Sequence, residues 1–322
     1  MSKEYIISID LGGTKILSAL INKGGEIFAK SKISTDVKSG KAGLIKGLLE
    51  SVSSVLEEGN LKIDDIRAIS LGVPGSVNPF TGKIGVAPNL NISNFNIKTE
   101  LEKYFAIPVL VENDVNLAAL GIKEFELKEK GNNILVAFIG TGIGGALILD
   151  KKLYRGTANF AGEIGHMHML KNGPMCGCGK KGCLEAIASR TAIVRNIKKD
   201  LKDKKNTKLR ALFPDGKPIK SKGLSLAIKK NNPTVVREIT DACNIIGIAL
   251  GNITNLLNLD MIVLGGGVIE AMDKFMIPRI KESFKKTVLT DAGRGVKIIA
   301  TKLGDDAALY GGIALAEEMG IK

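Results

Sequence analysis

The chain has 322 residues, which is enough for two domains that each bury their own core. Hydrophobic residues make up 44% of it and charged residues 25%, a composition that excludes wholesale disorder. The net charge of +13 would suit a polyanionic partner. With 10 Phe, 4 Tyr and no Trp, however, the chain has few rings on which bases could stack, so we expect no specific nucleic-acid partner.

Hydropathy predicts neither a membrane span nor a secretory signal. No run of about 18 apolar residues occurs, so we expect no membrane partner. The opening MSKEYIISID lacks the long apolar stretch of a signal peptide, and a cytoplasmic location is therefore expected. Much of the excess lysine lies in 198–222, which we interpret as a solvated insertion.

The first third of the chain predicts a three-stranded meander followed by alternating helices and strands. The expected strands are 5–10, 16–22, 26–34, 66–71 and 108–112, and the expected helices are 42–58, 97–104 and 115–125. Residues 73–96 are rich in Pro, Gly and Asn, and we expect loops there.

The pattern of strand, glycine-rich turn and strand then recurs. The expected strands are 134–139, 146–150, 152–156, 261–267 and 296–303, and the expected helices are 184–202, 233–257, 273–287 and 307–320. Two glycine hairpins about 130 residues apart suggest a duplicated α/β domain with a ligand cleft between the copies. The expected lobes are 1–117 and 118–306, with a final helix at about 307–322 packed back on the first lobe.

The first hairpin, DLGGTK, carries groups that suit a phosphate. Gly12 and Gly13 permit a tight turn that presents backbone N–H groups to an anion. Thr14 adds a hydroxyl donor and Lys15 a cation, while Asp10 could hold Mg²⁺ through water. Ordinary hairpin turns use the same residues, so this motif alone leaves both interpretations open.

The second hairpin, GTGIGG at Gly140–Gly145, matches the dinucleotide pattern G-x-G-x-x-G. That pattern must open a helix, whereas ALILD follows here, so a Rossmann site is not expected. The hairpin can still wrap phosphates through its N–H groups and the Thr141 hydroxyl, or it can be a plain turn. GGG at 265–267 permits close approach of a flat ligand such as adenine, or a strand-to-helix turn.

One cluster has the spacing and chemistry of a metal site. His166, Cys176, Cys178 and Cys183 form H-x9-C-x-C-x4-C in a glycine-rich loop. One imidazole and three thiolates complete a closed tetrahedral shell for Zn²⁺, which points to a structural ion. Unrelated free cysteines are the alternative.

Polar residues also follow predicted elements. Asn113 and Asp114 come after a buried strand and precede a helix, where either could be an N-cap and Asp114 could be a general base. Glu163 and Glu185 bracket the proposed zinc loop, whose folding would bring their carboxylates together. These carboxylates could accept hydrogen bonds from sugar hydroxyls or simply be solvated.

Together these motifs resemble the ROK family of bacterial sugar kinases (repressors, open reading frames, kinases), nearest to its glucokinase branch. DLGGTK and GTGIGG look like its two phosphate motifs, and ENDVNLAALG at 112–121 looks like its catalytic segment. AGEIGHM at 161–167 and CGCGKKGCLEA at 176–186 match its sugar and zinc elements. The resemblance implies an actin-like, hexokinase-type α/β fold of two lobes, each with a mixed sheet flanked by helices.

The resemblance also implies roles for individual residues. Asp114 would be the general base that accepts the proton of the sugar 6-hydroxyl, and His166 would bind zinc through one ring nitrogen and face the sugar with the other. The sugar would be held by Gly75, Asn89, Asn113, Asp114, Glu163, His166 and Glu185. Phosphates and Mg²⁺ would lie among Asp10, Gly12, Gly13, Thr14, Lys15, Gly140, Thr141 and Gly142, and adenosine beside Gly265, Gly266 and Gly267.

The expected activity is ATP-dependent phosphorylation of a hexose 6-hydroxyl, with glucose as the favoured substrate. N-acetylmannosamine, N-acetylglucosamine or fructose are alternative acceptors, and polyphosphate or another nucleotide is an alternative donor. A non-catalytic sugar-sensing regulator is the alternative from another class. We expect no helix-turn-helix domain, because the first strand begins at about Tyr5. A homodimer or homotetramer is expected by the same resemblance.

Overall fold

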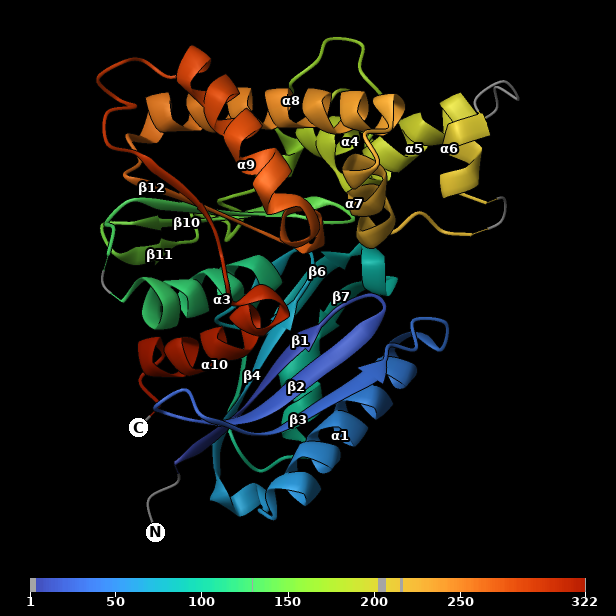
Figure 1. Ribbon diagram of the computed structural model, residues 1–322. Coiled ribbons are helices and arrows are strands. Elements are labelled where there is room, and N and C mark those ends of the chain that lie inside the picture. The colour runs from blue at the N-terminus through green and yellow to red at the C-terminus, as the bar shows by residue number, and fades with distance from the viewer. Residues whose placement is uncertain (1–3, 129, 202–206, 215–216, 322) are drawn as a thin grey trace. The chain divides into compact units, whose positions relative to one another are not determined.

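The computed structural model describes residues 4–128, 130–201, 207–214 and 217–321, and its contacts divide the chain into two compact units (Figure 1). The first unit comprises Met1–Lys130, Lys152–Ala161 and Asp305–Lys322. The second comprises Gly131–Lys151 and Gly162–Gly304. The first unit therefore contains residues 118–130 and 152–161, which the sequence analysis assigned to the second lobe.

A five-stranded sheet forms the centre of the first unit. Its strand order is β3-β2-β1-β4-β8, from β1 (Tyr5–Leu11), β2 (Lys15–Asn22), β3 (Ile27–Ser34), β4 (Ile66–Val73) and β8 (Val109–Asn113). β1, β2 and β3 are antiparallel, whereas β4 runs parallel to both β1 and β8. Asp10 lies opposite Gly72, which lies opposite Glu112. The register thus brings polar residues to the carboxyl ends of adjacent parallel strands.

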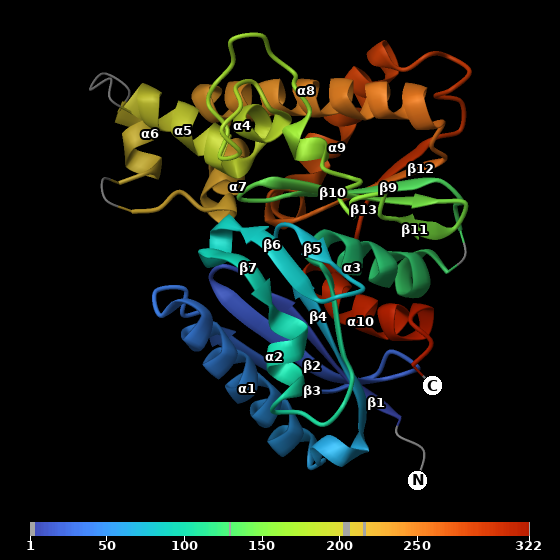
Figure 2. The ribbon, with the colours of Figure 1, turned by 180° about the vertical axis from the view of Figure 1, so that it is seen from behind.

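Helices cover both faces of this sheet, and β1 accordingly presents apolar residues to both of them. Ile7, Ile9 and Leu11 are buried in one core with residues of α1 (Gly40–Gly59) and α2 (Ile97–Glu102). Ile6 points to the other face and packs with α10 (Ala307–Glu318). Beside α10 lies α3 (Asp114–Gly121), and the two helices run together in both views (Figures 1 and 2).

Glycine permits the close approach of α10. A Cβ atom at Gly311 would lie 1.7 Å from the carbonyl oxygen of Leu117 in α3, and one at Gly312 would lie 2.1 Å from the Ser8 hydroxyl in β1. After α3 the chain continues as a π-helix, Ile122–Leu127, where the sequence predicted one continuous helix. The C-terminal helix thus supports the segment that begins at Asp114.

Residues 73–96, expected to be loops, instead contain a three-stranded antiparallel sheet. It consists of β5 (Val77–Asn78), β6 (Lys83–Ala87) and β7 (Ile92–Asn96), with the 3-10 turn Pro88–Leu90 between the last two. The loop prediction was wrong because strands of two and five residues are too short to show a periodic pattern.

The sheet of the second unit repeats this topology. β9 (Ile134–Ile139), β10 (Ile143–Leu149), β12 (Met261–Gly265) and β13 (Lys297–Ala300) are ordered β10-β9-β12-β13. β10 is antiparallel to β9, whereas β12 is parallel to β9 and β13. This is the arrangement of β2-β1-β4-β8, so the predicted duplication is confirmed. The short strand β11 (Lys152–Tyr154) follows β10 in the chain.

Helices α8 (Pro233–Leu257) and α9 (Gly267–Thr287) lie side by side on this second core (Figures 1 and 2). α9 begins six residues before its predicted start and has a kink at Met272. The helix predicted over 184–202 is two helices, α4 (Leu184–Ala188) and α5 (Arg190–Leu201).

The lysine-rich stretch is not simply a solvated insertion where the structure describes it. It contains α6 (Thr207–Leu212) and leads into α7 (Ser221–Lys229). Leu209, Phe213 and Ile219 are buried in the second core. Residues 202–206 and 215–216 lie outside the described residues. No helix in the described parts of the chain is long and apolar enough to cross a membrane.

Candidate active site

The first glycine hairpin is held in place by Lys15 at the start of β2 and by Thr35, the residue after β3. The N–H of Gly12 donates to the carbonyl oxygen of Lys15 (2.9 Å), and the Thr35 hydroxyl donates to the carbonyl oxygen of Gly12 (2.7 Å). A Cβ atom at Gly13 would lie 2.7 Å from the carbonyl oxygen of Asn89. Only glycine therefore lets this turn approach the 3-10 turn Pro88–Leu90, and the hairpin and Asn89 are neighbours.

Two charged side chains flank this hairpin. Burial raises the pKa of Asp10 to about 7, the negative charge of Asp114 adds to the rise, and Lys15 opposes it. Lys15 forms an ion pair with Asp305. A buried carboxylate that is costly to ionise gains most from a nearby cation, so Asp10 has the chemistry expected of a Mg²⁺ contact.

The start of α3 settles which residue caps the helix. The side-chain oxygen of Asn113 accepts hydrogen bonds from the N–H groups of Val115 (2.9 Å) and Asn116 (3.1 Å), so Asn113 is the N-cap. Asp114 is the first helical residue, and its Oδ1 accepts from the N–H of Val115 (3.0 Å). The carboxylate of Asp114 thus lies in the first helical turn, within electrostatic reach of Asp10.

Gly75 is in contact with the start of α3. The side-chain amide of Asn113 donates a hydrogen bond to the carbonyl oxygen of Gly75 (3.2 Å). Gly75 has φ +91°, and a Cβ atom there would lie 2.3 Å from the carbonyl oxygen of Val86, so the tight turn requires glycine. Among the predicted site residues of the first unit, the structure thus links Gly13 with Asn89, Gly75 with Asn113, and Asp10 with Lys15 and Asp114. Gly12 and Thr14 belong to the same hairpin as Gly13 and Lys15.

The second glycine hairpin joins β9 to β10. The N–H of Gly140 donates to the carbonyl oxygen of Gly142 (2.9 Å). Two residues at the start of α5 donate hydrogen bonds to Thr141 in this turn. The Arg190 guanidinium donates to the Thr141 hydroxyl (2.6 Å), and the Thr191 hydroxyl donates to the Thr141 carbonyl oxygen (2.7 Å). Sequence reasoning missed both residues, although Arg190 adds a positive charge to a predicted phosphate site.

A cavity of about 610 Å³ begins beside this hairpin. It is lined by residues that include Arg190, Thr191, Arg195, Lys198, Lys199 and Ile219. This volume is in the range of small-molecule sites, and the lining combines positive charge with apolar surface. The lysine-rich stretch, which the sequence analysis interpreted as a solvated insertion, thus supplies part of a basic cavity.

The glycine triplet 265–267 lies close to the same hairpin. Gly266 has φ +86°, and a Cβ atom there would lie 2.7 Å from the carbonyl oxygen of Ile139, the residue before Gly140. A Cβ atom added at Gly267 would have the Ser221 hydroxyl oxygen as its nearest neighbour, at 3.8 Å. That hydroxyl is buried and has no hydrogen-bond partner among the described residues. The triplet therefore makes a close turn and also leaves space beside a polar group.

Glu163 and Glu185 lie close to each other, as expected. Glu185 Oε2 accepts a hydrogen bond from the N–H of Ile143 (2.9 Å) in β10. Burial raises the pKa of Glu163, His166 opposes the rise, and the charge of Glu185 adds to it. Glu163 Oε2 lies 3.8 Å from His166 Nε2. Two carboxylates and an imidazole thus form one group of hydrogen-bonding side chains.

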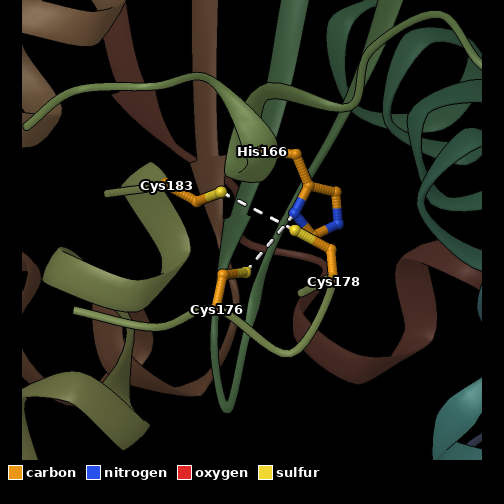
Figure 3. A group of neighbouring side chains, drawn as sticks. All are labelled: His166, Cys176, Cys178 and Cys183. Carbon is orange, nitrogen blue, oxygen red and sulfur yellow. Dashed lines mark hydrogen bonds between the residues drawn. The ribbon is translucent and has the colours of Figure 1, made fainter. Parts of the chain in front are cut away.

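His166, Cys176, Cys178 and Cys183 converge in the loop between β11 and α4 (Figure 3). Their four ligand atoms all lie within 4.8 Å of one another. His166 Nδ1 is 3.7 Å from Cys176 Sγ, and the Cys178 and Cys183 sulfur atoms are also 3.7 Å apart. A tetrahedral Zn²⁺ with Zn–S bonds of about 2.3 Å separates its sulfur ligands by about 3.8 Å. The donor set and its spacing therefore fit zinc.

The other ring nitrogen of His166 faces Glu163, and Cys176 Sγ is 3.8 Å from Glu185 Oε1. The proposed metal centre therefore touches both carboxylates of the group. His168 does not join the ligands, because its Nδ1 lies 3.0 Å from the carbonyl oxygen of Lys181.

Two repeated sheets, each with a glycine hairpin between its antiparallel strands, define an α/β protein of the actin-like ATPase fold. The chain belongs to the ROK family, whose sequence profile matches residues 6–319. The predicted family and fold class are both confirmed.

Individual relatives agree along nearly the full length. A glucokinase of Halalkalibacterium halodurans is 32% identical over 97% of this chain and 94% of that protein. The structure of a ROK family glucokinase from Streptomyces griseus, in complex with glucose and AMPPNP, has a TM-score of 0.85 and 28% identity and covers 98% of this chain and 99% of that one. A xylose repressor of Caldicellulosiruptor bescii is 28% identical over 96% of this chain and 77% of that protein.

Proposed function

We propose that this protein is an ATP-dependent hexose kinase that converts glucose to glucose 6-phosphate. The observation that carries the proposal is the position of Asp114 in the first turn of α3, in electrostatic contact with Asp10 beside the first glycine hairpin. The similarity to glucokinases, one of them bound to glucose and AMPPNP, supports both substrates.

In this reaction Asp114 accepts the proton of the sugar 6-hydroxyl as that oxygen attacks the γ-phosphorus. A new O–P bond forms, the bond to the β,γ-bridging oxygen breaks, and ADP leaves. Phosphoryl transfer depends mainly on positioning and charge neutralisation. Asn113 contributes to positioning, because it caps α3 and is itself held by the Gly75 carbonyl oxygen.

We assign hydrogen bonds to sugar hydroxyls to Glu163, His166 and Glu185. The same role is assigned to Gly75, Asn89 and Asn113. The hairpins at Gly12–Lys15 and Gly140–Gly142 bind phosphates. Adenosine occupies the 610 Å³ cavity, where Arg190 supplies positive charge, and the turn of Gly265, Gly266 and Gly267 lets it approach the backbone.

Two metals complete the proposal. Mg²⁺ bound by Asp10 would neutralise phosphate charge, and a structural Zn²⁺ bound by His166 and the three cysteines would orient the imidazole. With Nδ1 of His166 on the side of the cysteines, a bound metal would leave Nε2 available to the sugar and to Glu163.

We further propose that the enzyme is a homodimer or homotetramer that acts in the cytoplasm, where ATP is available, and that its product enters glycolysis. A protein of Listeria monocytogenes described as a putative N-acetylmannosamine kinase has a TM-score of 0.77 and 26% identity and covers 98% of this chain. An amino sugar is therefore the second candidate substrate.

The proposal is tested by measuring ATP-dependent ADP release with glucose, mannose, fructose, N-acetylmannosamine and N-acetylglucosamine. A dominant rate with glucose is expected. A dominant rate with an N-acetylated sugar would contradict the substrate and leave the chemistry intact. Sugar binding without turnover of any of the five would favour a sugar-sensing regulator, as the similarity to xylose repressors would then suggest.

A further inference from the structure

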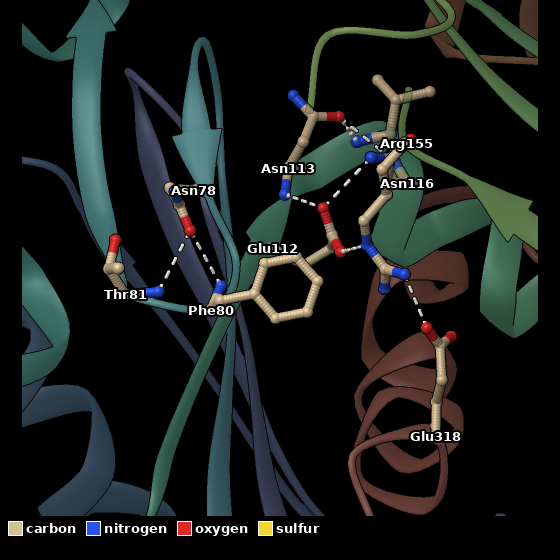
Figure 4. A network of polar contacts seen from close by, with 9 residues as sticks. Asn78, Phe80, Thr81, Glu112, Asn113, Asn116, Arg155 and Glu318 are labelled. Atoms are coloured by element: carbon tan, nitrogen blue, oxygen red, sulfur yellow. Dashed lines mark hydrogen bonds and ion pairs between the residues drawn. The ribbon is translucent and has the colours of Figure 1, made fainter. Parts of the chain in front are cut away.

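A buried ion pair lies directly behind the proposed catalytic segment. Glu112, the residue before Asn113, is 1% exposed. Its Oε2 accepts a hydrogen bond from Arg155 Nε (2.7 Å), and Arg155 Nη1 donates to Glu318 Oε1 in α10 (2.6 Å). Figure 4 shows the guanidinium between the two carboxylates. One side chain thus connects β8, the segment Lys152–Ala161 and the C-terminal helix.

The other oxygen of Glu112 holds the start of α3. Glu112 Oε1 accepts from the N–H of Asn113 (2.9 Å) and from the side-chain amide of Asn116 (3.0 Å) (Figure 4). Asn113 caps the helix, and Asp114 follows it. The Glu112 carboxylate therefore holds both the N-cap residue Asn113 and Asn116 in the first turn of α3.

The pairing is needed because a buried carboxylate without a partner is strongly destabilised. Burial lowers the pKa of Arg155, because it disfavours the charged guanidinium. The carboxylates of Glu112 and Glu318 raise that pKa by more, so it lies above its usual value. Without Arg155, the Glu112 carboxylate would turn toward water. That movement would alter its hydrogen bonds to Asn113 and Asn116.

Arg155 also has a distinctive place in the chain. It lies in Lys152–Ala161, a segment of the first unit that is preceded and followed by residues of the second. The proposed sugar ligand Glu163 is two residues beyond this segment. The ion pair of Arg155 is thus an anchor for the peptide that leads to Glu163.

We propose that Arg155 is a positioning residue for phosphoryl transfer, which acts by holding Glu112 and, through it, the first turn of α3 with Asp114. The inference rests on the proposed kinase function for its kinetic consequence. Its structural consequence, an ordered start of α3, is measurable independently of activity.

The test compares Arg155→Met with Arg237→Met, a control in which an exposed arginine paired with Asp200 and Glu238 is lost. At saturating ATP and glucose, Arg155→Met is expected to lower kcat about 10- to 100-fold, as a displacement of roughly 1 Å can. The affinity for glucose should fall less than kcat, because Arg155 acts only on the start of α3 and on the peptide before Glu163, whereas His166 and Glu185 keep their contacts. Arg155→Lys, which keeps a charge beside Glu112, should recover most of the rate.

The double variant Glu112→Gln/Arg155→Met guards against a simple loss of folding, since it removes both buried charges. If Arg155 acts through Glu112, Arg155→Met should matter less once Glu112 is already changed. The fold-reduction in kcat that Arg155→Met causes should therefore be at least about five times smaller in the Glu112→Gln background than in the wild type. An equal reduction in both backgrounds, or an unchanged kcat for folded Arg155→Met, would overturn the inference.

Hydrogen exchange supplies the second readout. The N–H groups of Asn113, Val115 and Asn116 should exchange faster in Arg155→Met than in Arg237→Met, and unchanged exchange would overturn the inference. A wild-type protein that phosphorylates no sugar would refute the proposed function, while the exchange rates would still decide whether Arg155 orders α3.

Discussion

The carboxylates of Asp10 and Asp114 lie close enough for the charge of one to oppose ionisation of the other. Asp10 is the last residue but one of β1, beside the first glycine hairpin, and Asp114 opens α3 at the end of the parallel strand β8. Burial, and to a smaller extent the negative charge of Asp114, raises the pKa of Asp10 to about 7. Two acidic groups in such proximity are poorly tolerated unless a cation or a proton is shared between them.

This relationship predicts how stability depends on pH. Folding raises the pKa of the Asp10 carboxyl, so its contribution to the free energy of unfolding is fully present below the unfolded pKa of 3.8. That contribution is lost as the pH rises through about 7. In metal-free buffer, Asp10→Asn should be more stable than the wild type at pH 8, by up to about 4 kcal/mol, and should lose less stability between pH 4 and pH 8. Urea unfolding at both pH values measures this difference.

The matched control is Asp64→Asn, which neutralises an exposed carboxylate in the 3-10 turn Ile63–Asp65. It should leave the wild-type pH dependence in place. Identical pH dependence of Asp10→Asn and the wild type would show that the Asp10 carboxyl is not the group responsible.

Metal content tests the cysteine cluster. Elemental analysis should find about one zinc per chain, and Cys178→Ser should lose most of it and weaken glucose binding through a freed His166. Cys243→Ala is the control, because Cys243 is buried in the second core outside the cluster. Active protein without bound metal would contradict the link between zinc and sugar affinity.

Arg190 should matter for the nucleotide and not for the sugar. Because its guanidinium holds the Thr141 hydroxyl at the second hairpin, Arg190→Met should raise the KM for ATP roughly tenfold. Arg294→Met, which removes an exposed arginine paired with Asp291, should leave that KM unchanged. Steady-state titration of ATP at saturating glucose distinguishes the two variants, and equal KM values would remove Arg190 from the nucleotide site.

Two glycines of one hairpin provide a further comparison. A Cβ atom at Gly142 would lie 2.2 Å from Glu185 Oε2, whereas one at Gly140 would meet no heavy atom within 4 Å. Gly142→Ala should therefore displace Glu185 from the Ile143 N–H and lower glucose affinity at least about tenfold. Gly140→Ala should leave glucose affinity near the wild-type value. Calorimetric titration with glucose checks both, and equal affinities would argue against Glu185 as a sugar ligand.

The sequence was informative where local pattern carries the signal. Glycine turns between apolar strands predicted both hairpins and the repeated sheet, and the spacing of His166 with three cysteines predicted the cluster that the structure brings together. In each case the residues are close in sequence or have the periodicity of one element.

Contacts between distant segments could not be predicted in the same way. Arg155 and Glu112 are 43 residues apart, and Arg190 and Thr141 are 49 apart, and no local pattern links either pair. The small sheet over 77–96 was missed because tertiary pairing, rather than propensity, stabilises such short strands. The lysine content of 198–222 likewise concealed the buried Phe213 and Ile219.

The most direct test of the central claim is the effect of Asp114→Asn on turnover and on glucose affinity, measured with the same preparation. Asparagine can still occupy the first helical turn but cannot accept the proton of the 6-hydroxyl. We expect kcat for ATP-dependent glucose phosphorylation to fall by at least about 1000-fold while the glucose dissociation constant stays within about fivefold of the wild type. Wild-type turnover in Asp114→Asn would contradict the assignment of Asp114 as the general base.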